Sequence, residues 1–168
     1  FKKSESLRFT FRKNTQFTDV NNLAQGYVFN NYNNIFQGNR ELEAAVVNGY
    51  SVAWDADVSE KGFSFKHGMA ILPQEGEMDK LWTEVVTEQE VTQASRQEGF
   101  ENQTTTDDHL MHIVGLATDQ NGEKYFIIKN SWGTGNKNGG KQYVSMAYFR
   151  SKTISVLVHE DAVIRMLK

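Results

Sequence analysis

Several features that often reveal a protein's chemistry are missing from this sequence. It contains no cysteine, so it has no disulfides and no thiolate metal site, and its composition says nothing about the redox compartment. No apolar run approaches membrane-spanning length, which gives no reason to expect a membrane partner. With a formal net charge of -3 and no basic stripe, nothing indicates a nucleic-acid partner. The chain begins with Phe1, which indicates a cut or processed end, so the lack of a signal peptide carries no information.

The residues that are present indicate one globular domain with a sizeable core. Of the 168 residues, 39% are hydrophobic and 12% are aromatic, which is typical of globular rather than disordered proteins. We expect residues 1–38 to form an N-terminal strand and loop region without an assigned role, and residues 39–168 to form a β-rich unit. The predicted fold class is α+β, with an antiparallel β-barrel or sheet and flanking helices.

Local patterns predict individual helices and strands. Asn39 is expected to cap a helix that runs through Val47 and ends at Gly49. A capping box of Thr87 and Glu90 predicts a second helix. In chain order, we expect a strand within residues 1–13, a loop over 21–39, the helix through 47, a strand over 50–58, strand fragments and loop over 59–86, the helix over 87–98 closed by Gly99, strands over 141–149 and 153–159, and a terminal helix over 160–168.

The strongest local signal is a β-hairpin. The apolar runs HLMHIVGLA and KYFIIKN flank the turn sequence TDQNG. The first strand follows the polar segment TTDD, and the second runs into Lys-Asn-Ser-Trp-Gly. Because a hairpin turn brings the beginning of one strand opposite the end of the next, a His and an Asn that are distant in the sequence meet at its open end.

A His beside an Asn has a chemical meaning. An imidazole that acts as a general base needs one nitrogen facing the nucleophile and an acceptor for its other N–H, which sets the tautomer and the ring orientation. An Asn side-chain oxygen does this without adding a charge, which suits a Cys–His ion pair. Trp132 follows closely after Asn130 and is expected to shield the His–Asn hydrogen bond from water.

The hairpin alone leaves open which His is involved. A turn centred on Asp119-Gln120 places His109 opposite Asn130. A turn centred on Asn121-Gly122, the more familiar turn sequence, makes His112 the neighbour instead. The two His residues are three positions apart on a strand and therefore point to opposite faces.

These segments resemble a known family. KNSWGTG followed by NKNGGKQYVSM is similar to the Asn-Ser-Trp-Gly segment of papain-like cysteine peptidases. DHLMHIVGL resembles the strand with their catalytic His, in which a Gly follows six residues after the His. Gly115 has this spacing from His109, which selects His109. GYSVAWDADVSEKGF and RQEGFENQTTTDDH resemble the bleomycin hydrolase/aminopeptidase C branch, and the resemblance covers roughly residues 45–160.

The resemblance implies both a fold and an activity. Papain-like enzymes combine a helical left half, with the oxyanion-hole Gln and the Cys nucleophile, with a right half built on an antiparallel β-barrel that bears the His and the Asn. This chain resembles the right half alone. The implied catalytic residues are His109 and Asn130, with Trp132 in a supporting position, while Ser131 is a structural part of the motif. The implied partners are a peptide substrate and a helical half that carries the Cys; no cofactor and no metal are implied.

The branch also implies exopeptidase behaviour. In it, the C-terminal carboxylate captures the substrate's α-amine, so residues are removed from the N-terminus. This chain stops at Lys168, sooner than the usual tail, which puts the aminopeptidase specificity in question. The family's hexameric cage is not carried over, so a homo-oligomer remains open. The family default implies the cytoplasm, and an exported form is the alternative.

Other polar and aromatic residues have simpler interpretations. The acidic and His residues within 107–112 resemble a metal cluster, but strand alternation spreads them over two faces. Trp54 and Asp55 either line a cleft or are a core Trp and a surface Asp. The remaining His residues are interpreted as ordinary hydrogen-bonded residues: His67, His112 and His159.

Two functions of different classes follow. The first is the C-terminal fragment of a cysteine aminopeptidase that hydrolyses peptide bonds by Cys-His-Asn chemistry, with its Cys on an N-terminal half. The second is a stand-alone, non-catalytic binding or assembly module that keeps the peptidase barrel. The retained His109, Asn130 and Trp132 favour the first function, and the lack of Cys favours the second unless the chain was cut. A Cys encoded upstream would discriminate between them.

Overall fold

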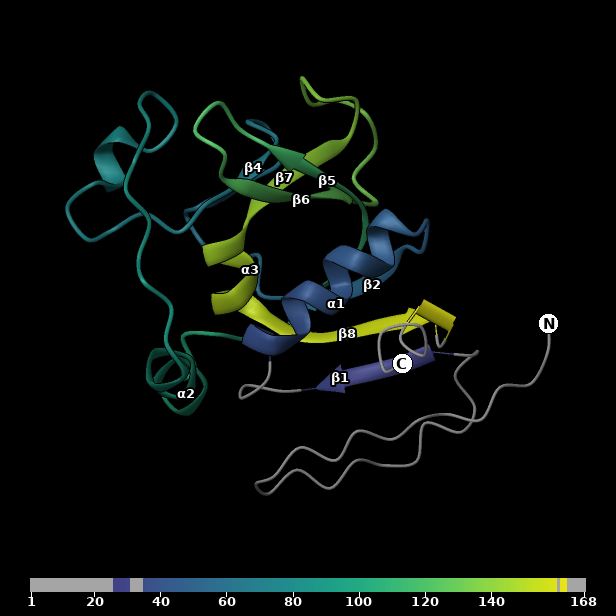
Figure 1. Cartoon of the computed structure of the whole chain (residues 1–168). Coiled ribbons are helices and arrows are strands. Elements are labelled where there is room, and N and C mark those ends of the chain that lie inside the picture. The colour runs from purple at the N-terminus through teal and green to yellow at the C-terminus, as the bar shows by residue number, and fades with distance from the viewer. Residues whose placement is uncertain (1–25, 31–34, 160, 163–168) are drawn as a thin grey trace.

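The computed structural model describes residues 26–30, 35–159 and 161–162. These residues form one curved sheet with helices packed against it (Figure 1). The strands are β1 (Gly26–Asn30), β2 (Val52–Ala56), β3 (Phe63–Ser64), β4 (Met69–Ala70), β5 (His109–Thr118), β6 (Lys124–Lys129), β7 (Lys141–Ser145) and β8 (Thr153–His159). The helices are α1 (Ile35–Val47), α2 (Gln93–Glu101) and α3 (Met146–Lys152), and a short 3-10 helix, η1, spans Met78–Lys80. The predicted α+β class is confirmed.

The strand order is β1-β8-β2-β5-β6-β7-β4-β3. Neighbouring strands pair antiparallel, except β4 and β7, which are parallel. The order begins at β1 and ends at β3, so the described strands form a strongly curved but open sheet (Figure 1). Of the two predicted forms, barrel or sheet, the sheet is correct for these residues.

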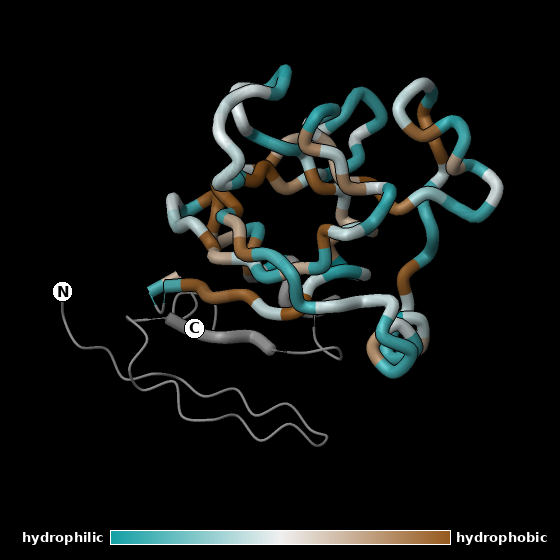
Figure 2. Tube along the Cα trace, turned by 180° about the vertical axis from the view of Figure 1, so that it is seen from behind, coloured by the Kyte–Doolittle hydropathy of each residue, from teal (hydrophilic) through white to brown (hydrophobic). Residues whose placement is uncertain are grey.

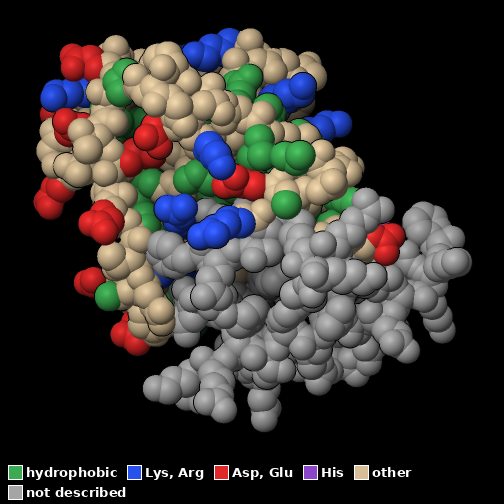
Figure 3. Space-filling model, in the orientation of Figure 1, with side chains coloured by type: hydrophobic (Ala, Val, Ile, Leu, Met, Phe, Trp, Pro, Cys, Tyr) green, Lys and Arg blue, Asp and Glu red, His purple; other side chains and the backbone are tan. Residues whose placement is uncertain are grey.

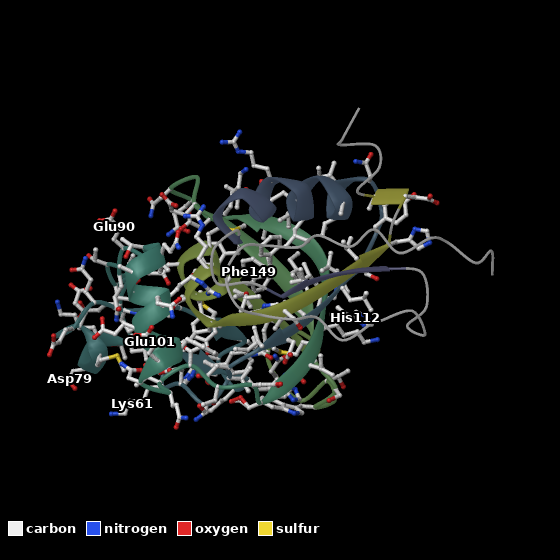
Figure 4. The ribbon with its side chains drawn as sticks, turned by 90° about the horizontal axis from the view of Figure 1, so that it is seen from below. Lys61, Asp79, Glu90, Glu101, His112 and Phe149 are labelled. Carbon is white, nitrogen blue, oxygen red and sulfur yellow. The ribbon has the colours of Figure 1, made fainter. Side chains whose placement is uncertain are left out.

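The concave face of the sheet holds the hydrophobic core. Along β2, alternate side chains are buried, and Trp54 is fully buried with its indole N–H donating to the Thr153 hydroxyl at 2.8 Å. The core interpretation of Trp54 is therefore correct. Helix α1 packs against β2, β5 and β8, and α3 packs against β6, β7 and β8, with Phe149 in the interior (Figure 4). Apolar segments follow the strands around this core, and hydrophilic segments follow the outer loops (Figure 2).

Helix α1 ends as predicted but begins earlier. Gly49 has a φ of +86°, its N–H donates to the Val46 carbonyl, and the Tyr50 N–H donates to the Ala45 carbonyl, both at 3.0 Å. This pair of bonds is a Schellman motif, which ends a helix where Gly adopts the left-handed conformation. The helix begins at Ile35, so the predicted cap at Asn39 lies within it.

The N-terminal predictions were partly wrong. Within the expected loop 21–39, residues 26–30 form β1, because their backbone pairs with all but the first residues of β8. A backbone that completes a sheet edge overrides the loop preference of Asn and Gly. The strand expected within residues 1–13 lies outside the described residues, as does most of the terminal helix 160–168. The division at residue 38 falls within α1 and stays a prediction.

The helix predicted over residues 87–98 is displaced. Helix α2 spans Gln93–Glu101, and its capping box joins Thr92 and Ser95 rather than Thr87 and Glu90. The reason is tertiary, because the Glu88 carboxylate accepts from the Leu72 N–H and the Ser145 hydroxyl, both at 2.6 Å. These bonds hold the segment in an extended conformation. The predicted end, Gly99, lies inside the helix.

The strand predicted over residues 141–149 is also wrong in its second half. Strand β7 ends at Ser145, and α3 begins at Met146. The Ser145 hydroxyl accepts from the Tyr148 N–H at 3.0 Å, which is an N-terminal helix cap. The expected strands over 50–58 and 153–159, and the fragments over 59–86, are present as β2, β8, β3 and β4.

The described surface is acidic on one side. Asp and Glu side chains gather over the loop around η1 and over α2 (Figure 3), where Asp79, Glu90 and Glu101 point outward (Figure 4). Among the described helices, none combines the length and apolar character needed to cross a bilayer.

Candidate active site

The β5–β6 hairpin is present as predicted, but its loop differs from both expected turns. Thr118 pairs with Lys124, and the loop comprises residues 119–123. It closes with the Asp119 N–H donating to the Glu123 carbonyl at 2.9 Å. The hairpin therefore has a five-residue loop and not a two-residue turn, so its length could not decide the register by itself.

A β-bulge at residues 113–115 decides which His faces the Asn. Beyond the bulge, the register shifts by one residue, and His112 pairs with Lys129. Continuing this pairing places the residue before His112 beside Asn130, and His109 lies two residues earlier on that same face. His112 is exposed on the other face. The structure therefore brings His109, and not His112, to Asn130.

The contact between His109 and Asn130 determines which ring nitrogen of the neutral His109 carries the proton. His109 Nε2 lies 2.8 Å from Asn130 Oδ1. The same oxygen accepts from the Ser131 backbone N–H at 2.7 Å, which identifies it as the oxygen rather than the nitrogen of the amide. Because an amide oxygen can only accept, Nε2 must donate. In the neutral imidazole, Nδ1 then carries the free lone pair and can accept a proton.

The Asn130 amide is itself held in place. Asn130 is 5% exposed, and its Nδ2 donates to Gln142 Oε1 at 3.2 Å. Gln142 is fully buried on β7 and was missed in the sequence. Its signal was available, because a Gln on the inward face of an alternating strand must find a buried partner.

The Trp132 ring lies beside the His–Asn pair. Its ring centroid is 4.8 Å from that of His109, and it meets Phe63 and Phe65 edge-on at 5.9 and 5.6 Å. Trp132 is nevertheless 44% exposed, so it covers only one side of the hydrogen bond. The sequence analysis did not identify the contacts of these two Phe residues with the indole.

The remaining His residues lie elsewhere. His67 Nδ1 and the Ser64 hydroxyl form a hydrogen bond of 2.9 Å, and the His67 ring stacks on Trp82. His159 stacks on Tyr50. Within the described residues, no group of three or more His, Asp and Glu side chains is placed to hold a metal ion.

Asp55 lies close to this site with an unusual protonation equilibrium. Its side chain is partly buried on β2, and one carboxylate oxygen has no hydrogen-bond partner among the described residues. Burial, and after it the nearby carboxylate of Asp107, raise the pKa of Asp55 to about 6, although the Ser155 hydroxyl lowers it in part. The interpretation of Asp55 as an ordinary surface Asp is therefore incomplete.

This pKa leads to a prediction about stability. The folded pKa lies above the ordinary value of 3.8, so the native state binds this proton more tightly than the unfolded chain. Its contribution to the free energy of unfolding is present below pH 4 and is lost as the pH rises to about 6. We expect Asp55→Asn to gain stability relative to the wild type between pH 4.5 and pH 7, measured by urea unfolding. Asp79→Asn, at an exposed position, should show no such gain, and an equal gain in both variants would contradict the assignment.

The described strands and helices thus form a curved sheet that holds His109 against Asn130 at the open end of a hairpin. The family model described as papain family cysteine protease matches residues 3–164, so the chain belongs to this family. Cathepsin L1 of Drosophila melanogaster is 42% identical over 53 residues, which are 29% of this chain and 14% of that protein. A cysteine protease of Blomia tropicalis is 51% identical over 41 residues, or 24% of this chain and 12% of that protein.

Solved structures add evidence on the fold. The crystal structure of pepw from Lactobacillus rhamnosis HN001 has a TM-score of 0.57 and 18% identity, and the match covers 76% of this chain and 27% of that chain. At this identity the likeness concerns the fold alone. The matches thus span 14%, 12% and 27% of these three proteins.

Proposed function

We propose that this chain provides the general base and its orienting residue to a cysteine peptidase whose Cys lies on a separate helical half. The observation that carries the proposal is the 2.8 Å contact between His109 Nε2 and Asn130 Oδ1, together with the Ser131 N–H that fixes the amide. This arrangement leaves Nδ1 as the proton acceptor. The substrate class is a peptide, in keeping with the family.

The proposed mechanism follows from these atoms. His109 Nδ1 takes the proton of the Cys thiol, and the thiolate attacks the scissile carbonyl to form a thioester after the amine leaves. The imidazolium gives its proton to the leaving amine, so no net proton is consumed in acylation. Water then releases the acid by the same base. Asn130 keeps the ring oriented in both steps, and Trp132 packs beside their hydrogen bond.

Within the family, we propose the bleomycin hydrolase/aminopeptidase C branch. The support is the similarity of residues 49–63 and 96–109 to segments of that branch. Aminopeptidase specificity is part of this proposal, with the terminal carboxylate of the full protein as the group that captures the substrate's α-amine.

A second candidate function is a stand-alone binding or assembly module. One observation favours it, namely that none of the 168 residues is a Cys. The two functions differ in what should cover the outer face of β5. There, Leu110 is 69% exposed and Val114 is 42% exposed, close along the strand to His109. A peptidase half would bury such apolar side chains against its helical partner, whereas an independent module has no reason to expose them.

We therefore expect the purified chain to self-associate or to bind an apolar fluorescent dye. Replacing Leu110 and Val114 by Asn should reduce both effects, because it removes the exposed apolar side chains. The matched control is Val85→Asn, since Val85 is 80% exposed on a distant loop and is not in the surface that the helical half should cover. Sedimentation and dye titration measure the two effects. If the chain is a monomer that binds no dye and unfolds cooperatively, this result would support the independent module and overturn the peptidase-half proposal.

A further inference from the structure

A buried lysine lies at the junction of α3 and β8. Lys152 is 7% exposed, and its ammonium group forms an ion pair with Glu60. The same group donates to the Thr104 carbonyl at 2.8 Å and to the Thr105 hydroxyl at 3.3 Å, and it lies 3.9 Å from Asp57 Oδ2. A buried ammonium is unfavourable unless it is paired and hydrogen-bonded, and all its contacts are to segments other than its own.

Asp57 extends these contacts. It is 1% exposed, and its Oδ2 accepts from the Thr106 N–H at 3.0 Å. Its Oδ1 accepts from both the backbone N–H and the hydroxyl of Ser59, at 2.9 and 2.8 Å. The Asp57 backbone N–H in turn donates to the Lys152 carbonyl at 3.0 Å. Lys152 and Asp57 thus join the end of α3, the turn after β2 and the segment over residues 104–106.

That segment leads directly into β5. Asp108 Oδ2 accepts from the backbone N–H groups of Val58 and Ser59, at 3.1 and 3.0 Å, so the turn after β2 holds the chain on both sides of Asp107. The next residue is His109, which pairs with Ala56 at the end of β2. The position of His109 along the sheet is therefore set by the contacts of the residues that precede it.

The charges in this cluster need the lysine. Burial raises the pKa of Asp108, the Val58 N–H lowers it, and the neighbouring Asp57 carboxylate raises it again. Asp57, Asp108 and Glu60 bring like charges to one turn, and Lys152 supplies the opposite charge to two of them. Without the ammonium, repulsion between the carboxylates would separate the turn from the segment before His109.

We propose that Lys152 is a positioning residue for His109, acting through Asp57 and residues 104–108. It sets where β5 begins, and hence the Nε2–Asn130 Oδ1 hydrogen bond and the direction of Nδ1. The effect on catalysis rests on the proposed function, but the effect on the His109 ring does not.

The first test uses the whole 168-residue chain and nitrogen NMR of ¹⁵N-labelled histidine. In the wild type we expect His109 to hold its proton at Nε2, and in Lys152→Met we expect a mixture of both tautomers. Lys152→Arg retains the cation and should restore the single tautomer in part. The matched control is Val158→Ala, which removes buried apolar atoms at the far end of β8 and should lower the melting temperature without changing the tautomer. If Lys152→Met does not fold, the double variant Lys152→Met/Glu60→Gln takes its place, because it removes both charges of the ion pair and leaves Asp57 intact.

The second test measures turnover of the chain assembled with a Cys-bearing helical half. We expect Lys152→Met to lower kcat per titrated thiolate by on the order of tenfold to a hundredfold, with KM nearly unchanged, because a displaced base affects the reaction more than substrate binding. Val158→Ala should retain its kcat. If the wild-type assembly is inactive, the proposed function is contradicted. The positioning role of Lys152 is then decided by the NMR result alone. Loss of stability with the tautomer and kcat both retained would overturn the positioning proposal.

Discussion

Replacing His109 by Ala in an enzyme assembled from this chain and a Cys-bearing helical half is expected to lower kcat/KM by about a hundredfold to ten-thousandfold, the usual contribution of a general base. The loss of the imidazolium also removes the counter-ion of the thiolate, which lowers the rate further. The measurement is steady-state hydrolysis of an aminoacyl fluorogenic substrate, with the fold of each variant checked by circular dichroism.

Two further variants, Asn130→Ala and His112→Ala, are expected to lower kcat/KM less than His109→Ala does. Asn130→Ala should lower kcat/KM less than His109→Ala, because the ring remains but loses the acceptor 2.8 Å from its Nε2. His112→Ala is the matched His control, since His112 is exposed on the opposite face of β5, and it should change stability more than rate. Leu110 and Val114 lie on that same face, so the comparison is made at a saturating concentration of the helical half, where weaker docking does not lower the rate. If His112→Ala abolishes turnover while His109→Ala keeps it, the catalytic base is His112 and the proposed site is wrong by one face of the strand.

The second large effect is expected from the chain on its own. Without a thiolate there is no group to form the acyl-enzyme, so the purified 168-residue chain should hydrolyse no aminoacyl fluorogenic substrate. Adding a helical half that carries the Cys should produce turnover, and a half with that Cys replaced by Ala should not. Turnover with the Cys-bearing helical half but not with its Cys→Ala version would distinguish restored catalysis from a contaminating peptidase.

The alternative nucleophile for the isolated chain is Ser131. Its backbone N–H donates to Asn130 Oδ1 at 2.7 Å, so the backbone of Ser131 has a structural part in the site, and the side chain is tested separately. Turnover by the chain alone that disappears in Ser131→Ala would contradict both the interpretation of Ser131 as structural and the need for a Cys. Turnover that survives Ser131→Ala would be traced to a contaminant by its profile with thiol and serine inhibitors.

Several elements were predictable because their signals are local. Alternating apolar residues predicted β2, and the left-handed conformation available to Gly49 predicted the end of α1. The apolar runs around a polar turn predicted the β5–β6 hairpin. In each case the periodicity or backbone preference of a few neighbouring residues agreed with the packing they later met.

Other elements depended on contacts that no local pattern contains. Glu88 was assigned to a helix by the capping residues beside it, but its carboxylate bonds to Leu72 and Ser145, which are far away in the sequence. Strand β1 formed from an expected loop because β8 offered it a free edge. Gln142, the buried partner of the Asn130 amide, was missed for the same reason.

The sequence by itself predicted that a His and an Asn meet at one end of a hairpin, and the resemblance to the papain-like His–Gly spacing selected His109. Only the tertiary structure decided the geometry, because the bulge at residues 113–115 shifts the register by one residue. Gly115 lies just past that bulge, where an added Cβ would be 3.2 Å from Ile127 Cδ1. Register and bulges are set by how whole strands pack on a shared core, a balance of many distant contacts, whereas the identity of the residues along each strand is set by the sequence alone.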